Sequence, residues 1–501
     1  MMSEPKRLHP AAAIINFIKL LKEMIIPLVI FIFANRGDGL LGVLMYSGAG
    51  LFLLLLIAFS LIRWLKFTYR IEEDELRIEQ GLFVKQKRFV PVERVQTINT
   101  RAGVIQQLFG LVRLEIETAS GGAEAEIELT AISKSEAAAI KHALNERKNV
   151  IKAENTGEVR LEDQSELLDE KLTYKMTRKE LLIGAATSSG IGVVLSAIFA
   201  FGSQLDEVLP VDSIFKRFEF LTHSGVPFLA FVIFLGFFIA WLLSIAGILL
   251  KYSGFKLEKT GDEFVISRGL IEKNQLTIPI RRIQAVKITE NPLRQPLGYA
   301  TVQLICASGK ADNDGLSAAI FPFVKTKEAV KLLEEFLPEY TYSMEKISVP
   351  KRALRKYVFR YTWPSLIPAG ILIFLFPHWG WFSLILIPLF ALFGFWAHKD
   401  SGYRIGGEQL TLHARAISKY SVVLPKKRMQ QMQITQSVFQ KQGDLATAGT
   451  SVMSNVFGAH FSVKDLELED GSRIYDWYSN RRLSSDAGDD TNNSQQDDDR
   501  D

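Results

Sequence analysis

The apolar residues of this chain are concentrated in six long stretches that come in three pairs. A helix needs roughly 20 mainly apolar residues to cross the hydrocarbon core of a bilayer. The second, third and fourth stretches reach this length without one charged residue, whereas Lys19, Lys22 and Glu23 interrupt the first. The fifth and sixth are short and share the turn at 377–381, so this pair either spans the membrane or forms a shallow hairpin. The pattern predicts a multi-pass α-helical membrane protein, with stretches at about 14–34, 40–62, 181–202, 227–250, 361–377 and 379–396.

A second pattern follows each pair of apolar stretches. Apolar and polar residues alternate there with the period of two that is typical of a half-buried β-strand, and turn residues separate the runs. A segment with helical periodicity closes the first two regions, at 134–148 and 325–337, and a weaker one at 472–482 closes the third. Strands are expected within 69–91, 110–122, 123–132, 255–279, 298–309, 315–324, 403–425, 445–455 and 457–466.

A short signature recurs in all three regions and sets their common register. Proline is followed by arginine at the third position, a hydrophobic residue at the fourth and glutamine at the fifth, in PVERVQ, PIRRIQ and PKKRMQ. Leu76, Phe264 and Leu410 each lie fifteen residues before the proline of their own copy. Three copies in register predict a duplicated β-rich domain of about 80 residues, which is enough for a core of its own. Short antiparallel strands followed by one amphipathic helix favour a small β-barrel or sandwich capped by that C-terminal helix.

These patterns divide the chain into alternating membrane and β-rich regions. The last residues are rich in aspartate and contain no apolar residue beyond Ala487, a composition typical of disorder. We expect transmembrane hairpins at 10–64, 177–250 and 352–397, β-rich domains at 65–148, 251–340 and 400–482, a linker at 149–176 and an acidic disordered tail at 483–501.

The arginine and glutamine of the signature are the candidate structural or docking residues. Hydrophobic residues at the fourth and seventh positions after the proline are three apart, which fits a proline-initiated turn leading into a strand better than clean alternation. The arginine then lies near the sheet margin, where it either satisfies backbone carbonyls or a neighbouring carboxylate, or presents a forked donor to a partner. We favour the structural role because the signature persists in all three copies. The six residues are Arg94, Gln96, Arg282, Gln284, Arg428 and Gln430.

Small residues recur at intervals of four in the third and fourth apolar stretches. Such ladders allow two helix backbones to approach closely in lipid. A pore lined by small residues is the alternative, but it requires polar or charged groups facing a lumen, and these stretches supply almost none. The candidate packing residues are Ser188, Gly192 and Ser196 in the third stretch and Gly236, Ala240 and Ser244 in the fourth.

Composition and charge support the membrane assignment and suggest an orientation. With 48% hydrophobic residues and a mean hydropathy of +0.12, the 501-residue chain is too apolar for an ordinary soluble protein. The net charge of +4 is small, and the basic residues flank the apolar stretches, which favours membrane lipids over nucleic acid as contacts. An even number of crossings places these flanks, both termini and all three β-rich regions on one side, which the positive-inside rule assigns to the cytoplasmic face of the plasma membrane. No signal-peptide cleavage pattern follows the first stretch, so we expect it to remain as an anchor.

No pattern in the sequence points to an enzyme, a metal or a cofactor. The GxGxxG match at 37–42 joins two membrane stretches rather than a strand and a helix, so its context is wrong for dinucleotide binding. The seven histidines show no ligand spacing, and the lone Cys306 leaves no intramolecular disulfide. The first strand-to-strand loop of the first domain is acidic, at 72–75, and would repel a phosphate. The basic cluster of Lys85, Lys87 and Arg88 in the next turn is either a contact for anionic lipid or a solvated turn.

The arrangement resembles the bacterial pleckstrin-homology-like (bPH2, DUF304) membrane proteins. The residues that carry the resemblance are the RLHP start at 7–10, the hairpin, the P-x-x-R-[VIM]-Q signature and the LFG or PLG that follows it at 108–110 and 296–298. Three copies resemble the larger type in this family, and the resemblance covers residues 7 to about 482. The third copy departs from the pattern, because Arg415 replaces Gly81 and Gly269 and QGD at 442–444 replaces LFG.

The resemblance implies a protein whose PH-like domains act as docking or assembly modules. It also implies a smaller relative with one hairpin and one PH-like domain as the probable membrane-protein partner, in a homo- or hetero-oligomer. Two alternatives stay open: a membrane-stress or antimicrobial-peptide resistance factor, and a component of a transporter or channel. The latter is expected to show intramembrane charges or broken helices.

Overall fold

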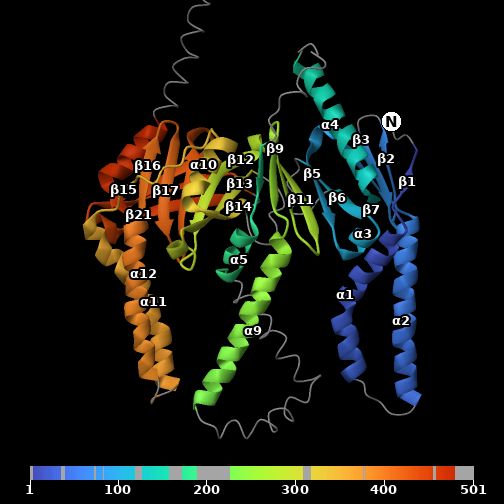
Figure 1. Ribbon diagram of the computed structural model, residues 1–501, viewed down its shortest axis with the longest axis horizontal. Coiled ribbons are helices and arrows are strands. Elements are labelled where there is room, and N and C mark those ends of the chain that lie inside the picture. Colours follow the sequence, from blue (N-terminus) through green and yellow to red (C-terminus); the bar gives the residue numbers. More distant parts are fainter. Residues whose placement is uncertain are drawn as a thin grey trace, which may run out of the picture. The chain divides into compact units, whose positions relative to one another are not determined.

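The structure is a computed structural model, which describes residues 4–34, 40–72, 75–82, 84–118, 127–156, 172–188, 226–307, 317–375, 377, 380–454 and 458–479. The chain falls into two compact parts, Met1–Pro279 and Ile280–Asp501. Each part contains apolar helices and antiparallel sheets (Figure 1). The third apolar stretch beyond residue 188, with Gly192 and Ser196, lies outside the described residues, as do the acidic tail and most of the linker.

The N-terminal part begins with a short strand, a helical hairpin and a four-stranded sheet. The Ser60 hydroxyl donates to the carbonyl of Ala13 at 2.6 Å, and the Trp64 indole donates to the carbonyl of Leu8 at 2.8 Å. The first bond joins the two helices, and the second joins α2 to the segment before α1. The order of the sheet is β1-β2-β3-β4, with all neighbours antiparallel. The elements are β1 (Lys6–Arg7), α1 (Ala11–Ala34), α2 (Leu40–Leu65), β2 (Thr68–Glu72), β3 (Glu75–Gln80) and β4 (Gln86–Pro91).

The chain then leaves this sheet through a short turn and builds three strands of a second sheet. A closing helix follows, as its helical periodicity predicts, and three of its apolar residues are buried: Ala137, Ile140 and Leu144. The elements are η1 (Val92–Arg94), β5 (Val95–Ala102), α3 (Val104–Leu108), β6 (Leu111–Thr118), β7 (Ile127–Ser133) and α4 (Lys134–Thr156).

The second copy repeats this order, but its first strands join the sheet that the first copy began. The result is one seven-stranded sheet of order β7-β6-β5-β11-β10-β9-β8. Its added elements are β8 (Thr173–Lys175), α5 (Arg178–Ala186), α9 (Val226–Tyr252), β9 (Lys256–Thr260), β10 (Glu263–Arg268) and β11 (Lys273–Pro279).

The C-terminal part is built in the same way. The last strands of the second copy and the first strands of the third share a seven-stranded sheet of order β14-β13-β12-β18-β17-β16-β15. Its elements up to the third hairpin are η2 (Ile280–Arg282), β12 (Ile283–Glu290), η3 (Gln295–Leu297), β13 (Tyr299–Cys306), β14 (Ser317–Lys325), α10 (Thr326–Phe336), β15 (Ile347–Ser348), η4 (Lys351–Ala353), α11 (Leu354–Leu375), η5 (Gly380–Ile385) and α12 (Leu386–Asp400).

The third copy ends in a three-stranded sheet of order β19-β20-β21. A helix at 468–479 closes it, so the weak periodicity seen in this region of the sequence does form a helix. The elements are β16 (Gly402–Gly406), β17 (Gln409–Arg415), β18 (Lys419–Pro425), η6 (Lys426–Arg428), β19 (Met429–Thr435), α13 (Val438–Lys441), β20 (Leu445–Val452) and β21 (Ala459–Glu467).

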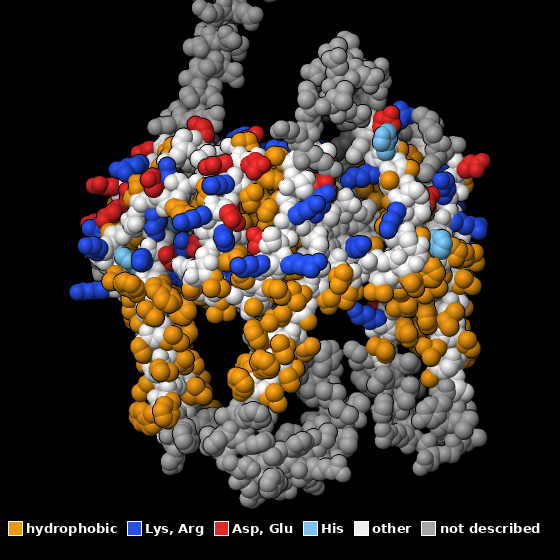
Figure 2. Space-filling model, viewed as in Figure 1, with side chains coloured by type: hydrophobic (Ala, Val, Ile, Leu, Met, Phe, Trp, Pro, Cys, Tyr) orange, Lys and Arg blue, Asp and Glu red, His pale blue; other side chains and the backbone are white. Residues whose placement is uncertain are grey.

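Four of the described helical segments are long and apolar enough to cross a membrane. In Figure 2 hydrophobic side chains cover these helices, while charged side chains gather over the sheets. Both members of the third pair reach spanning length, which favours a full crossing over a shallow hairpin. The segments are Ser47–Leu65, Phe234–Tyr252, Lys351–Leu375 and Gly380–Asp400.

The core lies on the inner faces of the sheets, and the residues that set the common register are its centre. Leu76, Phe264 and Leu410 are all fully buried, and each pairs across its strand with the residue before the signature proline. The described strands form open sheets rather than the closed barrel considered from the sequence. The physical reason is that the outer edges of β5 and β12 pair with strands of the next copy, so they do not close a barrel within their own copy.

Candidate functional site: signature turns and junctions between copies

The proline signature lies where the chain crosses from one sheet to the next. In each copy the proline ends a strand, the next three residues form one turn of 3₁₀-helix, and the hydrophobic residue at the fourth position begins the following strand. Proline suits this place because it cannot donate to a ladder and because its ring fixes φ, at −59° for Pro91 and −65° for Pro425. The turns η1, η2 and η6 join β4 to β5, β11 to β12 and β18 to β19.

The glutamine of the signature is the additional residue of a β-bulge. In the first copy Val95 pairs with Thr118 and Thr97 pairs with Glu117, so Gln96 is the extra residue of its strand. The same shift in register follows Ile283 in the second copy and Met429 in the third. A bulge takes one side chain out of the alternation. This explains why the hydrophobic residues of the signature are three apart.

The arginines of the three signatures stand in different surroundings. Arg94 is exposed, whereas Arg282 and Arg428 are half-buried. The carbonyl of Arg282 accepts from the Ala307 amide at 2.9 Å and from the Gln284 side chain at 3.2 Å. Each arginine stands at its own turn, so the structure does not gather them into one site. The role of the guanidinium groups stays a prediction.

The glutamines of the three signatures differ in the same way. Gln284 is buried, Gln96 is half-buried and Gln430 is exposed. The three glutamine side chains therefore share no common surroundings. What they share is the backbone position of the extra residue in the bulge.

The QGD segment of the third copy keeps the backbone geometry of LFG and PLG. The last residue of each triplet has a positive φ, at 68° for Gly110, 70° for Gly298 and 47° for Asp444. Aspartate is one of the few residues with a side chain that tolerates this region. The turn therefore survives the change in sequence.

The second departure of the third copy changes the structure. Arg415, which replaces Gly81 and Gly269, continues its strand and is buried. Its Nε lies 2.5 Å from the Asp400 carboxylate, and its guanidinium lies 5.8 Å from the ring centre of Trp396. In the third copy this position fastens the sheet to the end of α12.

Adjacent copies are joined by antiparallel strand pairing, which sequence reasoning did not anticipate. In the first junction β5 pairs with β11. The Thr277 amide donates to the Asn99 side chain at 3.0 Å, and the Thr100 hydroxyl donates to Gln275 at 3.1 Å. This pairing adds a strand of one domain to the open sheet edge of another, a recognised mode of protein association.

The second junction pairs β12 with β18 and adds charged contacts. Lys419 Nζ lies 2.8 Å from the Glu290 carboxylate, and both side chains are largely withdrawn from solvent. The Lys287 ammonium lies 5.4 Å from the ring centre of Tyr420. Burial lowers the pKa of Lys287 below its usual value.

The two junctions have the same register. Lys273, six residues before its proline, lies opposite Ala102, eleven residues after the proline of the preceding copy. In the second junction Lys419, six residues before Pro425, lies opposite Glu290, eleven residues after Pro279. The only sequence signal for this is a lysine six residues before all three prolines, at Lys85, Lys273 and Lys419.

The membrane helices of the third pair are bonded directly to the last sheets. The Arg360 guanidinium lies 2.6 Å from the carboxylate of Asp465, which is completely buried. The hydroxyl of Tyr357 donates to the carbonyl of Lys464 at 2.7 Å, and that of Tyr361 donates to the carbonyl of Arg415 at 2.6 Å. A movement of this hairpin is thereby coupled to the third copy.

The described members of the predicted small-residue ladders differ in burial. Ala240 and Ser244 of α9 are buried, Ser188 is half-buried and Gly236 is exposed. The Trp241 indole donates to the carbonyl of Ala186 at 3.1 Å, so α9 is in contact with the last residue of α5.

The described helix glycines with the closest neighbours on another helix lie in the third pair, outside the predicted small-residue ladders. A Cβ atom at Gly394 would be 2.7 Å from the Cα of Val358, and one at Gly380 would be 2.4 Å from the Cα of Ile373. These two glycines let α11 pack closely against α12 and η5.

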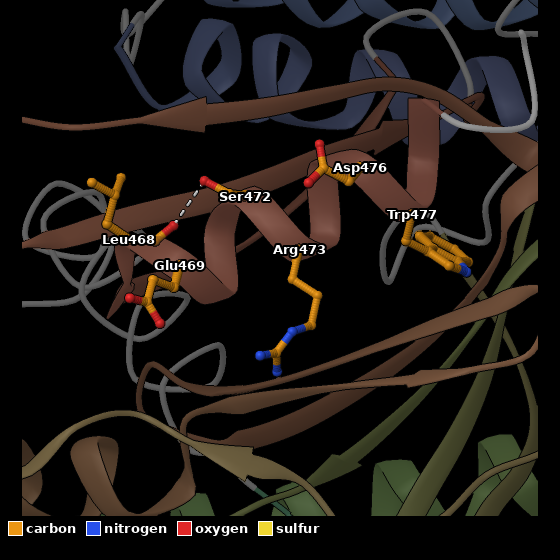
Figure 3. Close-up of a pocket in the computed structure, with 6 residues that line it drawn as sticks. All are labelled: Leu468, Glu469, Ser472, Arg473, Asp476 and Trp477. Carbon is orange, nitrogen blue, oxygen red and sulfur yellow. Dashed lines mark hydrogen bonds between the residues drawn. The ribbon is translucent and has the colours of Figure 1, made fainter.

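Described residues of the third copy line two hollows of a size that can hold a ligand. The larger, of about 680 Å³, is an open groove along one face of the closing helix (Figure 3). The smaller, of about 330 Å³, lies beside α11 and contains Arg360 and Arg415, whose guanidinium groups already bind Asp465 and Asp400. Among the described residues no group of three or more His, Cys, Asp or Glu side chains is placed to hold a metal. The groove in Figure 3 is lined by Leu468, Glu469, Ser472, Arg473, Asp476 and Trp477.

The basic cluster of the first copy is partly neutralised. Lys85 Nζ lies 2.5 Å and Lys87 Nζ 3.6 Å from the Glu79 carboxylate. The hydrogen bond from Lys85 lowers the pKa of Glu79. These lysines are therefore less available to anionic lipid than their sequence suggests.

Comparison with known proteins places these features in a family. The Bacterial PH domain family matches the chain three times, at residues 24–148, 215–339 and 364–482, and each match contains one signature turn. The UPF0699 transmembrane protein YdbT of Bacillus subtilis (strain 168) is 44% identical to the chain over 491 residues, which cover 96% of the chain and 99% of that relative. No solved structure matches the chain significantly.

Proposed function

The chain belongs to the Bacterial PH domain family, as a transmembrane protein with three copies of the domain, and from this premise we propose that it is an assembly scaffold of the plasma membrane. Its PH-like domains act as docking modules for other membrane proteins. A smaller family member with one hairpin and one PH-like domain is the proposed partner.

The observation that carries this proposal is the pairing of strands between successive domains. In both junctions the edge of one PH-like domain is completed by a strand of the next. Main-chain hydrogen bonds supply affinity in such contacts, and side chains on alternate positions supply selectivity. A domain that already binds another copy of its own kind in this way is suited to bind further PH-like domains.

We infer from the distribution of charge that the docking modules face the cytoplasm. The charged residues of the described spans gather at the ends nearest the sheets, as Arg63, Lys251 and Lys399 show. Basic residues flanking membrane helices favour the cytoplasmic side. The same distribution leaves the middle of these spans uncharged, which supports a scaffold over a transporter or channel.

The proposal is of a non-enzymatic protein. It is supported by the state of the two arginines in the smaller hollow, Arg360 and Arg415, which are held by carboxylates instead of being directed at an open space. A catalytic site requires donors and acceptors that converge on a reacting atom.

A co-purification experiment tests the proposal. The tagged full-length chain is cross-linked in intact membranes with an amine-reactive reagent, solubilised and purified beside a tagged membrane protein of unrelated fold. We expect a smaller membrane protein of the same family to co-purify in a fixed ratio with this chain and to be absent from the control. Purification without any second membrane protein, with or without cross-linking, would contradict the proposed partner.

A further inference from the structure

Each internal junction pairs a strand that ends at a signature proline with a strand that follows the signature turn of the preceding copy. One described strand of each of these two kinds takes part in no internal junction. In the part of the chain that the structure describes, β4 ends the first sheet and β19 ends the last one. β4 is the counterpart of β11 and β18, and β19 is the counterpart of β5 and β12, because each occupies the same place relative to its proline. Among the described strands, these are two open edges that are the complementary halves of a contact that the chain makes twice internally.

The side chains of β4 are exposed at a position that the junctions bury. Two residues before the proline, Thr277 is 3% exposed in the first junction and Val423 is fully buried in the second. Phe89 occupies the same position in β4 and is 53% exposed. The Arg77 guanidinium lies 5.5 Å from the centre of this ring. An open strand edge presents unpaired N–H and C=O groups to which a further strand can bind.

β19 offers a suitable surface for that ring. Val286, opposite Val423, lies seven residues after its proline and is fully buried. The same position is held by Ile98 in the first copy and by Met432 in the third, where it is half-buried. Pairing in the common register brings Phe89 against Met432, and thioether sulfur makes favourable contacts with aromatic rings.

Lys85, directly before β4, does not argue against pairing. Lysine on an edge strand commonly protects it from association. Here, however, Lys273 and Lys419 occupy the position of Lys85 in two strands that are paired. In the common register Lys85 lies opposite Gln436, eleven residues after Pro425, whose amide oxygen is a hydrogen-bond acceptor.

We propose that the β4 edge of one copy of this chain pairs with the β19 edge of a second copy, antiparallel and in the register of the internal junctions. This inference rests on the proposed scaffold function and names one of its partners, namely the chain itself. Both edges are present on every copy, so no further component is required. Because the hairpins hold every copy in the membrane, copies meet in two dimensions, which raises their effective concentration.

The contact is heterologous, since β4 and β19 are different surfaces. A heterologous contact gives a ring when its rotation closes and an open row when it does not. In either case, a junction between two copies joins neighbouring domains by the same kind of strand pairing that forms the two seven-stranded sheets within one chain.

Engineered disulfides in the full-length chain test the contact. Two chains with different tags, both carrying Cys306→Ala, are expressed together, one with Lys87→Cys and the other with Ile434→Cys. These residues lie four before and nine after their prolines, and the corresponding pair inside the chain is Gln275 with Thr100. After oxidation of membranes we expect a product of twice the 56.4 kDa chain mass that contains both tags.

Two controls make the result specific. Gln275→Cys with Thr100→Cys on one chain reports that this register forms a disulfide at all. Gln433→Cys in place of Ile434→Cys moves the thiol to the other face of β19, so we expect on the order of tenfold less product. Adding Phe89→Glu should abolish the product, whereas Val84→Glu, which replaces an exposed residue outside the strand, should leave it unchanged.

Each result of the cross-linking experiment either supports or overturns the pairing of β4 with β19. The mixed product supports the proposal. Its absence while the internal control forms, a disulfide only within a single chain carrying both cysteines, or capture of a different protein at Lys87→Cys would each overturn it. A smaller family member that co-purifies without any mixed product upholds the scaffold function and refutes self-pairing. The mixed product without a co-purifying protein supports self-pairing and contradicts the proposed smaller partner.

Discussion

At the scale of single residues, the signature directs the chain from the last strand of one sheet into the first strand of the next. Proline ends one strand, the 3₁₀ turn redirects the chain, and the glutamine position forms the bulge that starts the next strand. The sequence predicted the turn, because hydrophobic residues three apart do not fit clean alternation. It did not predict the surroundings of Arg94, Arg282 and Arg428, since these depend on the neighbouring strands and helices of each copy.

A buried histidine gives the third domain a dependence on pH. His413 is 2% exposed, and its Nδ1 lies 2.7 Å from the Ser421 hydroxyl. Burial, reinforced by the nearby charges of Lys346, Lys419 and Arg404, lowers the pKa of His413 to about 4. The unfolded chain binds this proton below about pH 6.5. The contribution of neutral His413 to stability is therefore fully present above pH 6.5 and is lost as the pH falls from 6.5 to 4.

We predict that the free energy of unfolding falls by about 3 kcal/mol across this window on account of His413. Thermal melting of the full-length chain in detergent, at pH 7 and at pH 4.5, measures the loss. Acidic groups also titrate at low pH, so the matched variant His413→Asn isolates the contribution of the imidazole. An equal drop in melting temperature for both proteins would show that His413 does not carry it.

Gly269 is a second residue whose local geometry makes a sharp prediction. Its φ is 104°, and a Cβ atom would lie 1.9 Å from the Glu272 carbonyl oxygen. We expect Gly269→Ala to lower the free energy of unfolding by about 1–3 kcal/mol, the usual cost of a strained backbone position. Gly406→Ala, where the space is open and φ is ordinary, is the control. Similar melting temperatures for the two variants would contradict the strain.

At the scale of elements, most strands and helices follow from local pattern, but the pairing between copies does not. The expected helix at 325–337 is α10 (Thr326–Phe336), and the expected strand at 298–309 is β13 (Tyr299–Cys306). Alternation identifies a strand and its buried face, but both edges of a strand look alike in sequence. The short strands β1, β8 and β15 were missed because two or three residues show no period.

Helix packing in the third hairpin supports a prediction at this scale. Gly394 of α12 faces the backbone of α11, where a Cβ atom would lie 2.7 Å from Val358 and 3.0 Å from the carbonyl of Tyr357. We expect Gly394→Ala to destabilise the chain by about 1–3 kcal/mol through overpacking. Gly236→Ala in α9 meets no atom within 4 Å and should leave the melting temperature in detergent unchanged. If both variants melt alike, the close approach of α11 and α12 is not a source of stability.

At the scale of the whole molecule, the hairpins and the domains are built as continuous structures. The core of the first domain includes Leu8, Ala11, Ala12 and Ile15 from the start of the first membrane helix. In the third domain the buried Asp465 is neutralised by Arg360 of α11. The sequence placed hairpins and domains next to each other in order, but it did not show that they share cores, because most of the shared residues, such as Leu8, Ala11 and Arg360, lie just outside the apolar stretches.

The orientation of this arrangement in the membrane is the last prediction. Basic flanks beside every described span favour a cytoplasmic location for all the domains and both termini, and this requires an even number of crossings between residues 155 and 485. Single cysteines at Asn155 and Ser485, each in the Cys306→Ala chain, should react with a membrane-impermeant thiol reagent only after the cells are permeabilised. Asp38→Cys, in the loop between the first two apolar stretches, should react in intact cells. Labelling of only one of the two positions 155 and 485 in intact cells would mean an odd number of crossings and would place successive domains on opposite sides of the membrane, where the pairing of β5 with β11 or of β12 with β18 is physically excluded.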